Sequence, residues 1–104
     1  MDTPTIITLN LTDCKHIDDM HLRIKQAFHF PDYYGENWDA FWDLIDGMRE
    51  NTIVEIQGIS SLPERLKEEA EKMIVCLEDN KIEMQKLKQC CPDFDCRFDY
   101  RFMD

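Results

Sequence analysis

Three carboxylates on one short predicted helix are the residues of this chain best placed to do chemistry. Asp39, Asp43 and Asp46 are four and three residues apart between Asn37 and Gly47, and that spacing puts them on one helix face. Like charges so spaced cost about 0.2–0.5 kcal/mol per pair, and the helix dipole offsets this only for Asp39, in the first turn. No lysine or arginine follows on this face. The stripe therefore indicates a surface for a basic partner, with an ordinary solvated acidic face as the alternative.

Aromatic side chains accompany the acidic stripe. Tyr33 and Tyr34 lie in the loop just before the helix, and Trp42 lies at the border between its acidic and apolar faces. Asp32 and Glu36 add negative charge to the same loop. Aromatic residues beside concentrated charge are typical of protein-recognition hot spots, so this combination favours docking to another protein.

Catalysis and metal binding are less well supported. Asp39 and Asp43 could form an acid/base pair, but on an exposed helix face both carboxyls stay hydrated, which does not favour acid/base catalysis. Cys90, Cys91 and Cys96 could suggest zinc, with Asp93 and Asp95 nearby as further ligands. Their spacing matches no standard zinc site, and no C-x2-C pair completes it. We expect no enzymatic activity, no metal and no cofactor.

Charge and composition restrict the partner. The net charge is −10, from 22 acidic and 12 basic residues, which argues against direct nucleic-acid binding. It favours a basic partner attracted over long range, although charge alone fits equally well an acidic protein that lacks such a partner. The sequence shows no secretory signal and no membrane-length apolar run. Five cysteines without a regular framework indicate reduced thiols, and we expect a cytoplasmic protein.

The elements that must position the stripe can be read along the chain. At 104 residues we expect a single domain over residues 1–104. Apolar periodicity and turn residues predict strands at 5–9, 53–56 and 94–102, and helices from 17 to about 29, 37–47 and 63 to about 87. This order predicts a small α/β domain whose three-stranded parallel sheet packs against helices.

Local signals refine the first two helices. Asn37 is a suitable N-cap and Gly47 a suitable C-terminal stop for the second helix, and Gly35 is the expected site of any positive φ in the loop before it. The predicted core stripe of the first helix is Ile17, Met20, Ile24, Ala27 and Phe28. The predicted core stripe of the second is Trp38, Phe41, Leu44 and Ile45. The histidines, expected on the surface, are His16, His21 and His29.

Residues 31–43 carry a resemblance to a known family. They read Pro-Asp-Tyr-Tyr-Gly-Glu-Asn-Trp-Asp-Ala-Phe-Trp-Asp. This resembles the signature P-x-Y-Y-G-x-N-x-D-A-x-W-D of the barstar family, whose members inhibit ribonucleases of the barnase type. The predicted order of elements also agrees over nearly the whole chain, although outside the motif the match is one of pattern rather than identity.

The resemblance implies a mechanism and a set of contacts. In the family, the loop and second helix enter the ribonuclease active site. Asp43 would lie where a substrate phosphate sits, among the enzyme's arginine and histidine side chains; Asp39 would pair with a further cation, and Tyr33 would stack at the rim. Alignment of the last helix adds two acids, for which a solvated helix end is an equally good interpretation. The implied contact residues are Tyr33, Tyr34, Gly35, Asn37, Asp39, Trp42, Asp43, Asp79 and Glu83.

The function expected from this resemblance is inhibition of, or immunity to, a basic bacterial ribonuclease toxin, either barnase-like or the toxin domain of a larger secreted protein. The alternative is an acidic binding module, or an immunity protein for a toxin that is not a ribonuclease, built on the same scaffold. Some residues depart from the family pattern. Trp38 stands where an aliphatic core residue is usual, and Met48 replaces an aromatic residue. The segment 86–95 is longer than in the family, and the last strand alternates apolar with polar residues instead of being nearly all apolar.

Overall fold

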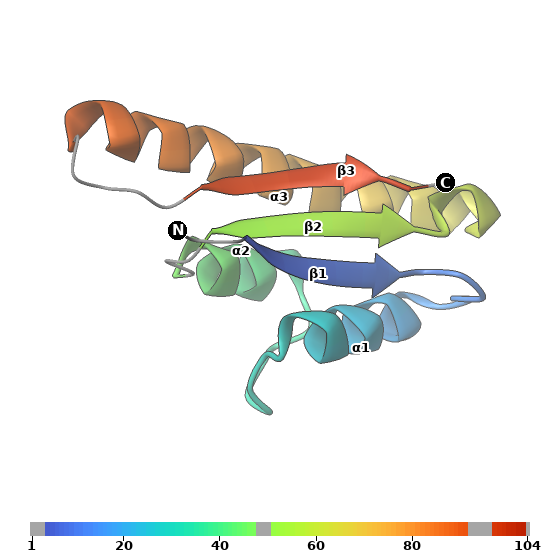
Figure 1. The fold of residues 1–104 in the computed structure, drawn as a ribbon. Coiled ribbons are helices and arrows are strands. Elements are labelled where there is room, and N and C mark those ends of the chain that lie inside the picture. The colour runs from blue at the N-terminus through green and yellow to red at the C-terminus, as the bar shows by residue number, and fades with distance from the viewer. Residues whose placement is uncertain (1–3, 48–50, 92–96, 104) are drawn as a thin grey trace.

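The computed structural model describes residues 4–47, 51–91 and 97–103. Strands and helices follow one another in the predicted order (Figure 1). The elements are β1 (Thr5–Asn10), α1 (Ile17–Phe28), α2 (Trp38–Asp46), β2 (Thr52–Gln57), the short 3-10 helix η1 (Ile59–Ser61), α3 (Glu64–Cys90) and β3 (Phe98–Phe102). None of the helices in these ranges is long and apolar enough to span a membrane.

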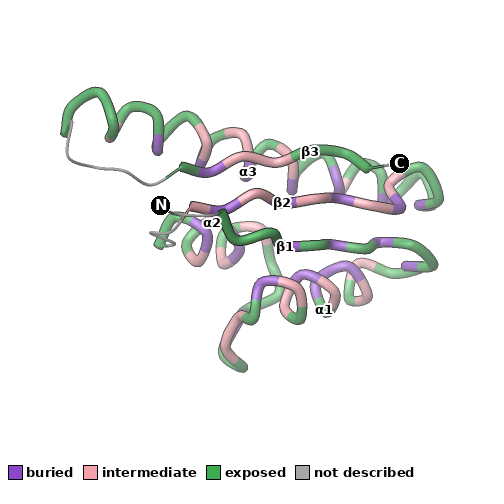
Figure 2. The backbone as a smooth tube through the Cα atoms, viewed as in Figure 1, coloured by how far each residue is buried: buried purple, intermediate pink, exposed green. Residues whose placement is uncertain are grey.

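The sheet is parallel throughout, as predicted. Its order is β1-β2-β3, with β2 in the centre. Thr5 pairs with Thr52, which in turn pairs with Phe98. Side chains alternate between the two faces of a strand: in β1, Ile7 is buried while Ile6 is exposed. The helices therefore cover one face of the sheet and leave the other to solvent (Figures 1 and 2).

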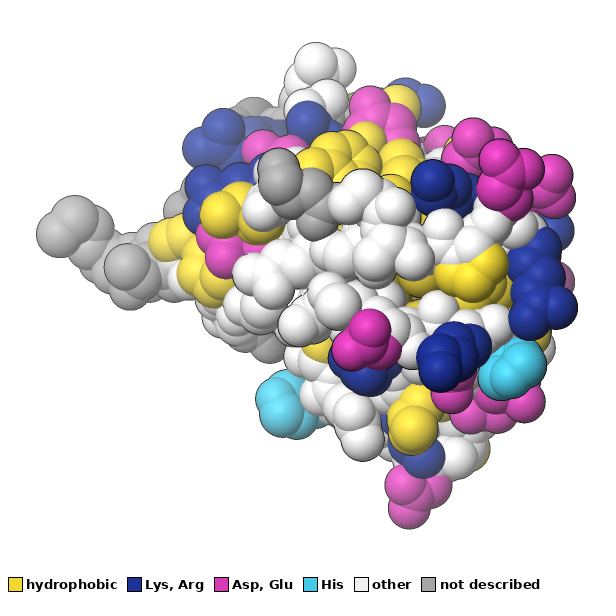
Figure 3. Space-filling view, turned by 90° about the vertical axis from the view of Figure 1, so that its right-hand side faces the viewer, with side chains coloured by type: hydrophobic (Ala, Val, Ile, Leu, Met, Phe, Trp, Pro, Cys, Tyr) yellow, Lys and Arg dark blue, Asp and Glu magenta, His cyan; other side chains and the backbone are white. Residues whose placement is uncertain are grey.

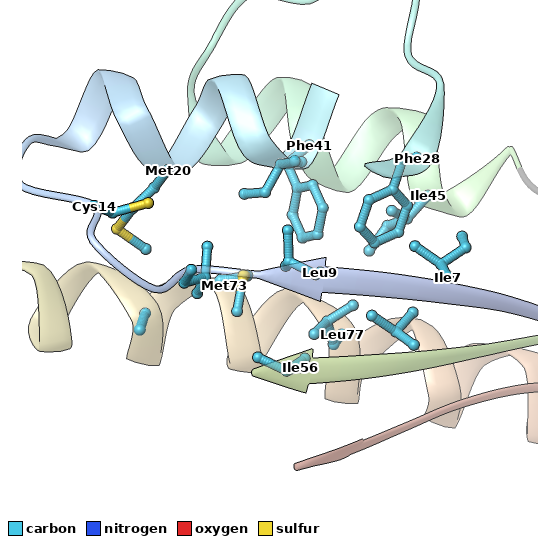
Figure 4. Packing of buried hydrophobic residues seen from close by; sticks show 14 of the residues in the cluster. Ile7, Leu9, Cys14, Met20, Phe28, Phe41, Ile45, Ile56, Met73 and Leu77 are labelled. Atoms are coloured by element: carbon cyan, nitrogen blue, oxygen red, sulfur yellow. The ribbon is translucent and has the colours of Figure 1, made fainter. Parts of the chain in front are cut away.

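The core lies between the sheet and the helical layer. β1 contributes Leu9, α1 contributes Ile24, α2 contributes Phe41 and α3 contributes Leu77, all fully buried. Figure 4 shows these layers meeting, with Phe41 and Phe28 directed at β1. The rings of Phe28 and Phe41 meet edge to face at 5.6 Å, a preferred aromatic geometry. Burial of the predicted stripes of α1 and α2 is therefore confirmed, with Ile17, Ala27, Trp38 and Leu44 only partly buried.

The third helix and last strand differ from expectation in part. α3 continues to Cys90, past the expected end near Leu87. In β3, Phe98 is buried but Phe102 is 52% exposed, so the expected alternation fades toward the strand end. There Phe102 borders a shallow groove between η1 and α3 instead of lying beneath a helix. Residues 94–96 of the predicted strand lie outside the described residues.

The described cysteines, Cys14, Cys76, Cys90 and Cys91, are free thiols. Within the described ranges no three His, Cys, Asp or Glu side chains are grouped so as to hold a metal ion. Cys96, Asp93 and Asp95, which belonged to the cluster considered above, lie outside those ranges.

Candidate partner-binding site

The loop before α2 is shaped by Asn37. The Asn37 Nδ2 donates a hydrogen bond to the Gly35 carbonyl at 3.2 Å, and a Cβ added to Gly35 would come within 3.1 Å of that nitrogen. The positive φ of the loop falls on Glu36, at 53°, rather than on Gly35. The prediction for Gly35 is therefore wrong: its missing side chain makes room for Asn37, and the left-handed backbone lies one residue later.

The same asparagine caps α2. The Asn37 Oδ1 accepts a hydrogen bond from the Ala40 backbone N–H at 2.8 Å, and Gly47 follows the helix end. Such a cap stabilises a helix by about 0.5–2 kcal/mol relative to alanine. Asn37 thus fixes both the loop and the first turn of α2, which carries Asp39.

The acidic stripe of α2 faces solvent. Asp39, Asp43 and Asp46 are exposed, whereas Phe41 and Ile45 on the opposite side are fully buried. Within the described part of the chain, neither Asp39 nor Asp43 has an ion-pair partner. These two carboxylates are therefore open to an incoming cation.

Aromatic residues flank the stripe unequally. Tyr33 is 80% exposed, and Trp42 is half-buried where it packs against the core. Tyr34, by contrast, is only 6% exposed. Tyr33 and Trp42 can meet a partner directly, whereas Tyr34 supports the loop from below.

Helix α3 brings further carboxylates to the same surface. The Cys76 Sγ donates a weak hydrogen bond to the Trp38 carbonyl at 3.9 Å. Burial raises the pKa of the Cys76 thiol, and the carboxylates of Asp79 and Asp39 raise it further. Both carboxylates therefore lie near one thiol at the contact between α2 and α3. Glu83 is exposed and falls one turn beyond Asp79 on the same helix face.

A buried histidine supports the loop. His21 is only 2% exposed, and its Nδ1 lies 2.7 Å from the Tyr34 hydroxyl. Burial lowers the pKa of His21 and raises that of Tyr34. The expectation of a surface histidine is wrong here, although the spacing of His21 from Ile17 and Ile24 was a signal for the buried stripe. His16 and His29 are exposed as expected.

Trp38 links the two helices of the site. Its Nε1 donates a hydrogen bond to the Glu69 Oε2 on α3 at 2.7 Å, and its ring packs on His21 with centroids 4.5 Å apart. The hydrogen bond from Trp38 is the main cause of a lowered pKa at Glu69. Nothing in the sequence pattern pointed to Glu69, because its role depends on how α3 packs against α2.

The face at the carboxyl ends of the strands looks different. There, lysine and arginine side chains are mixed with aspartate and glutamate, and small hydrophobic patches lie among them (Figure 3). Ile59, Ile74 and Phe102 line a shallow groove at the strand ends. The acidic stripe of α2, in contrast, carries one sign of charge only.

Comparison with known proteins identifies the family. The model of the barstar (barnase inhibitor) family matches residues 5–92. The chain belongs to the barstar family. The resemblance carried by residues 31–43 is thereby confirmed, as is the α/β fold it implied.

The barstar match encloses the loop, α2 and all of α3, and therefore the whole candidate site. The chain is also similar to a protein named "Putative ribonuclease inhibitor YrdF" of Bacillus subtilis (strain 168). That similarity is 42% identity over 41 residues, which is 39% of this chain and 45% of the relative. The matched stretch thus spans less than half of the relative.

Proposed function

We propose that this barstar-family chain inhibits a basic ribonuclease by filling its active site with carboxylates. The observation that carries the proposal is the group of exposed acids contributed by two packed helices. Asp39 and Asp43 come from α2, and Asp79 and Glu83 from α3. A ribonuclease keeps cations preorganised for a phosphate, and carboxylates on a rigid surface satisfy those cations through charge-assisted hydrogen bonds.

Within this proposal each residue has a role. Asp43 occupies the phosphate position, Asp39 pairs with a further cation, and Tyr33 stacks at the rim. Gly35, Asn37 and Trp42 complete the contact surface around them. Tyr34, buried under the loop, acts by holding Tyr33 and its neighbours in place.

Rigidity and charge support the mechanism. The Asn37 cap and the buried side of α2 fix the acids before binding, so that little conformational entropy is lost on association. The net charge of −10 attracts a basic enzyme over long range and speeds encounter. A catalytic role is not part of the proposal, because carboxylates on an exposed, hydrated surface are poorly suited to acid/base catalysis.

We further propose that the protein acts in the bacterial cytoplasm, as an immunity protein toward a ribonuclease toxin. A barnase-like enzyme or the toxin domain of a larger secreted protein would serve as partner. The second candidate is an acidic module that uses the same face on a basic protein of another kind. A gene for a small basic ribonuclease beside that for this chain would favour the first candidate.

The direct test is inhibition of RNA cleavage. The purified chain is titrated into a barnase-type ribonuclease and, as a control, into a ribonuclease of acidic surface. We expect stoichiometric inhibition of the basic enzyme alone. Tight binding to the basic enzyme without loss of cleavage would favour the second candidate, since the acids would then dock outside the active site.

A further inference from the structure

One hydrogen bond fastens the start of α2 to α3. The indole N–H of Trp38 meets a carboxylate oxygen of Glu69 at 2.7 Å. The other oxygen of Glu69 lies 3.3 Å from the Lys72 ammonium, so the carboxylate is held from both sides. A donor bonded to an ionised acceptor makes one of the stronger hydrogen bonds in proteins.

The Trp38 ring is also fixed by its other neighbours. It packs on His21 from α1 with centroids 4.5 Å apart. It meets Phe41 edge to face at 5.8 Å. The Trp38 carbonyl accepts from Cys76 on α3. Trp38, the first residue of α2, is therefore attached to α3 at two points. Its side chain binds Glu69 and its backbone carbonyl binds Cys76.

These attachments involve residues that lie close in sequence to acids of the candidate site. Asp39 follows Trp38 directly, and Asp79 follows Cys76 by three residues. Both carboxylates act electrostatically on the Cys76 thiol, so both lie close to the same point of the helix contact. The separation of Asp39 from Asp79 therefore depends on how the start of α2 is seated on α3.

We propose that the Trp38–Glu69 hydrogen bond is a positioning element that sets the spacing between Asp39 and Asp79, and with it the spacing of partner cations that the surface accepts. The inference rests on the proposed function, because it concerns the same acidic surface. Trp38 faces the helix contact and the core, so it acts through Asp39 rather than by touching the partner. The hydrogen bond thus determines specificity without belonging to the contact surface.

Trp38→Phe tests this by removing the indole N–H while keeping an aromatic ring. Tyr100→Phe is the matched control, because Tyr100 likewise donates to a carboxylate of α3, Glu78, at 2.9 Å, but from the sheet. We expect Trp38→Phe to weaken inhibition of a barnase-type ribonuclease by about 3- to 10-fold, the factor that a typical hydrogen bond supplies. Tyr100→Phe should lower the thermal stability about as much as Trp38→Phe does but leave inhibition unchanged.

A double-mutant cycle separates positioning from mere stability. If Trp38 acts through Asp39, Trp38→Phe should have less than about a twofold effect in an Asp39→Ala background. Glu69→Gln, which keeps a carbonyl acceptor for the indole, should retain most of the inhibition. An equal effect of Trp38→Phe in both backgrounds, or an equal loss in Tyr100→Phe, would overturn the inference.

If the wild-type chain does not inhibit the enzyme, the proposed function fails. A measurement on the free protein still tests the inference in that case. Asp39→Asn should lower the pKa of the Cys76 thiol, followed by NMR of cysteine labelled at Cβ, because one of the carboxylates that raise it is gone. In a Trp38→Phe background this decrease should be clearly smaller, since Asp39 is no longer held beside the thiol. An unchanged decrease would show that the hydrogen bond does not position Asp39.

Discussion

Asp43→Ala should separate binding from folding more cleanly than any other substitution in this chain. Asp43 is exposed and has no ion-pair partner among the described residues, so its removal takes nothing from the fold. The substitution also removes the repulsion between Asp43 and two like charges on the same helix face, Asp39 four residues before it and Asp46 three residues after it. At about 0.2–0.5 kcal/mol per pair, we expect the free protein to become slightly more stable.

Binding should change in the opposite direction and by far more. Truncating one partner of a buried charge pair costs about 2–5 kcal/mol, a range that the barnase–barstar complex itself helped to define. At about 1.4 kcal/mol per tenfold, this corresponds to a loss of affinity between roughly 30-fold and several thousandfold, mostly through faster dissociation. The loss is large because, in the Asp43→Ala complex, the enzyme's cations stay buried without a counter-charge.

The assay measures inhibition of RNA cleavage and the rate of dissociation for wild type, Asp43→Ala and the control Asp46→Ala. Thermal unfolding of the free variants is measured beside them. Asp46→Ala should inhibit almost as well as wild type, because no family contact corresponds to it. If Asp43→Ala folds normally and inhibits like wild type, the reasoning that puts this carboxylate in the enzyme's active site is refuted.

Three further predictions follow from the same structure. The association rate with a basic partner should fall as salt rises from about 0.02 to 0.5 M; a rate indifferent to salt would exclude the acidic face as the docking surface. The free energy of unfolding should decrease as pH drops below the 6.5 of an ordinary histidine, because burial lowers the pKa of His21 in the fold and the unfolded chain takes up the proton first. His21→Gln should remove that part of the pH dependence in urea titrations. Asn80→Leu should raise the free energy of unfolding by about 1–3 kcal/mol, since the buried Asn80 amide has no hydrogen-bond partner among the residues that the structure describes. A lower urea midpoint for this variant would mean that the amide is satisfied.

Local signals predicted the elements of the fold well. Asn37 and Gly47 bound α2 in the structure as in the sequence, because capping depends on a few adjacent residues. The parallel sheet followed from the order of strands and helices. Such features need no knowledge of distant contacts.

Features that depend on packing were harder to predict. Gly35 tolerates a positive φ, but its contact with Asn37 left that conformation to Glu36. His21 sat on an apolar stripe and was still assigned to the surface, because histidine is polar and its partner Tyr34 lies in another element. The proximity of Asp39 to Asp79 came only from the family resemblance, since the sequence alone does not give the packing of α2 on α3.

The order of pairing in the sheet has a consequence for how the chain folds. β1 reaches β2 only across α1 and α2, and β2 reaches β3 only across the whole of α3. Every ladder contact is therefore non-local, and closing such long loops is slow compared with forming helical turns. Helical signal in a stopped-flow refolding experiment should accordingly precede burial of the core aromatics. Because β2 pairs with both neighbours, we expect its docking to limit the folding rate. Substitutions at Val54 should then slow folding more than equally destabilising ones in α1.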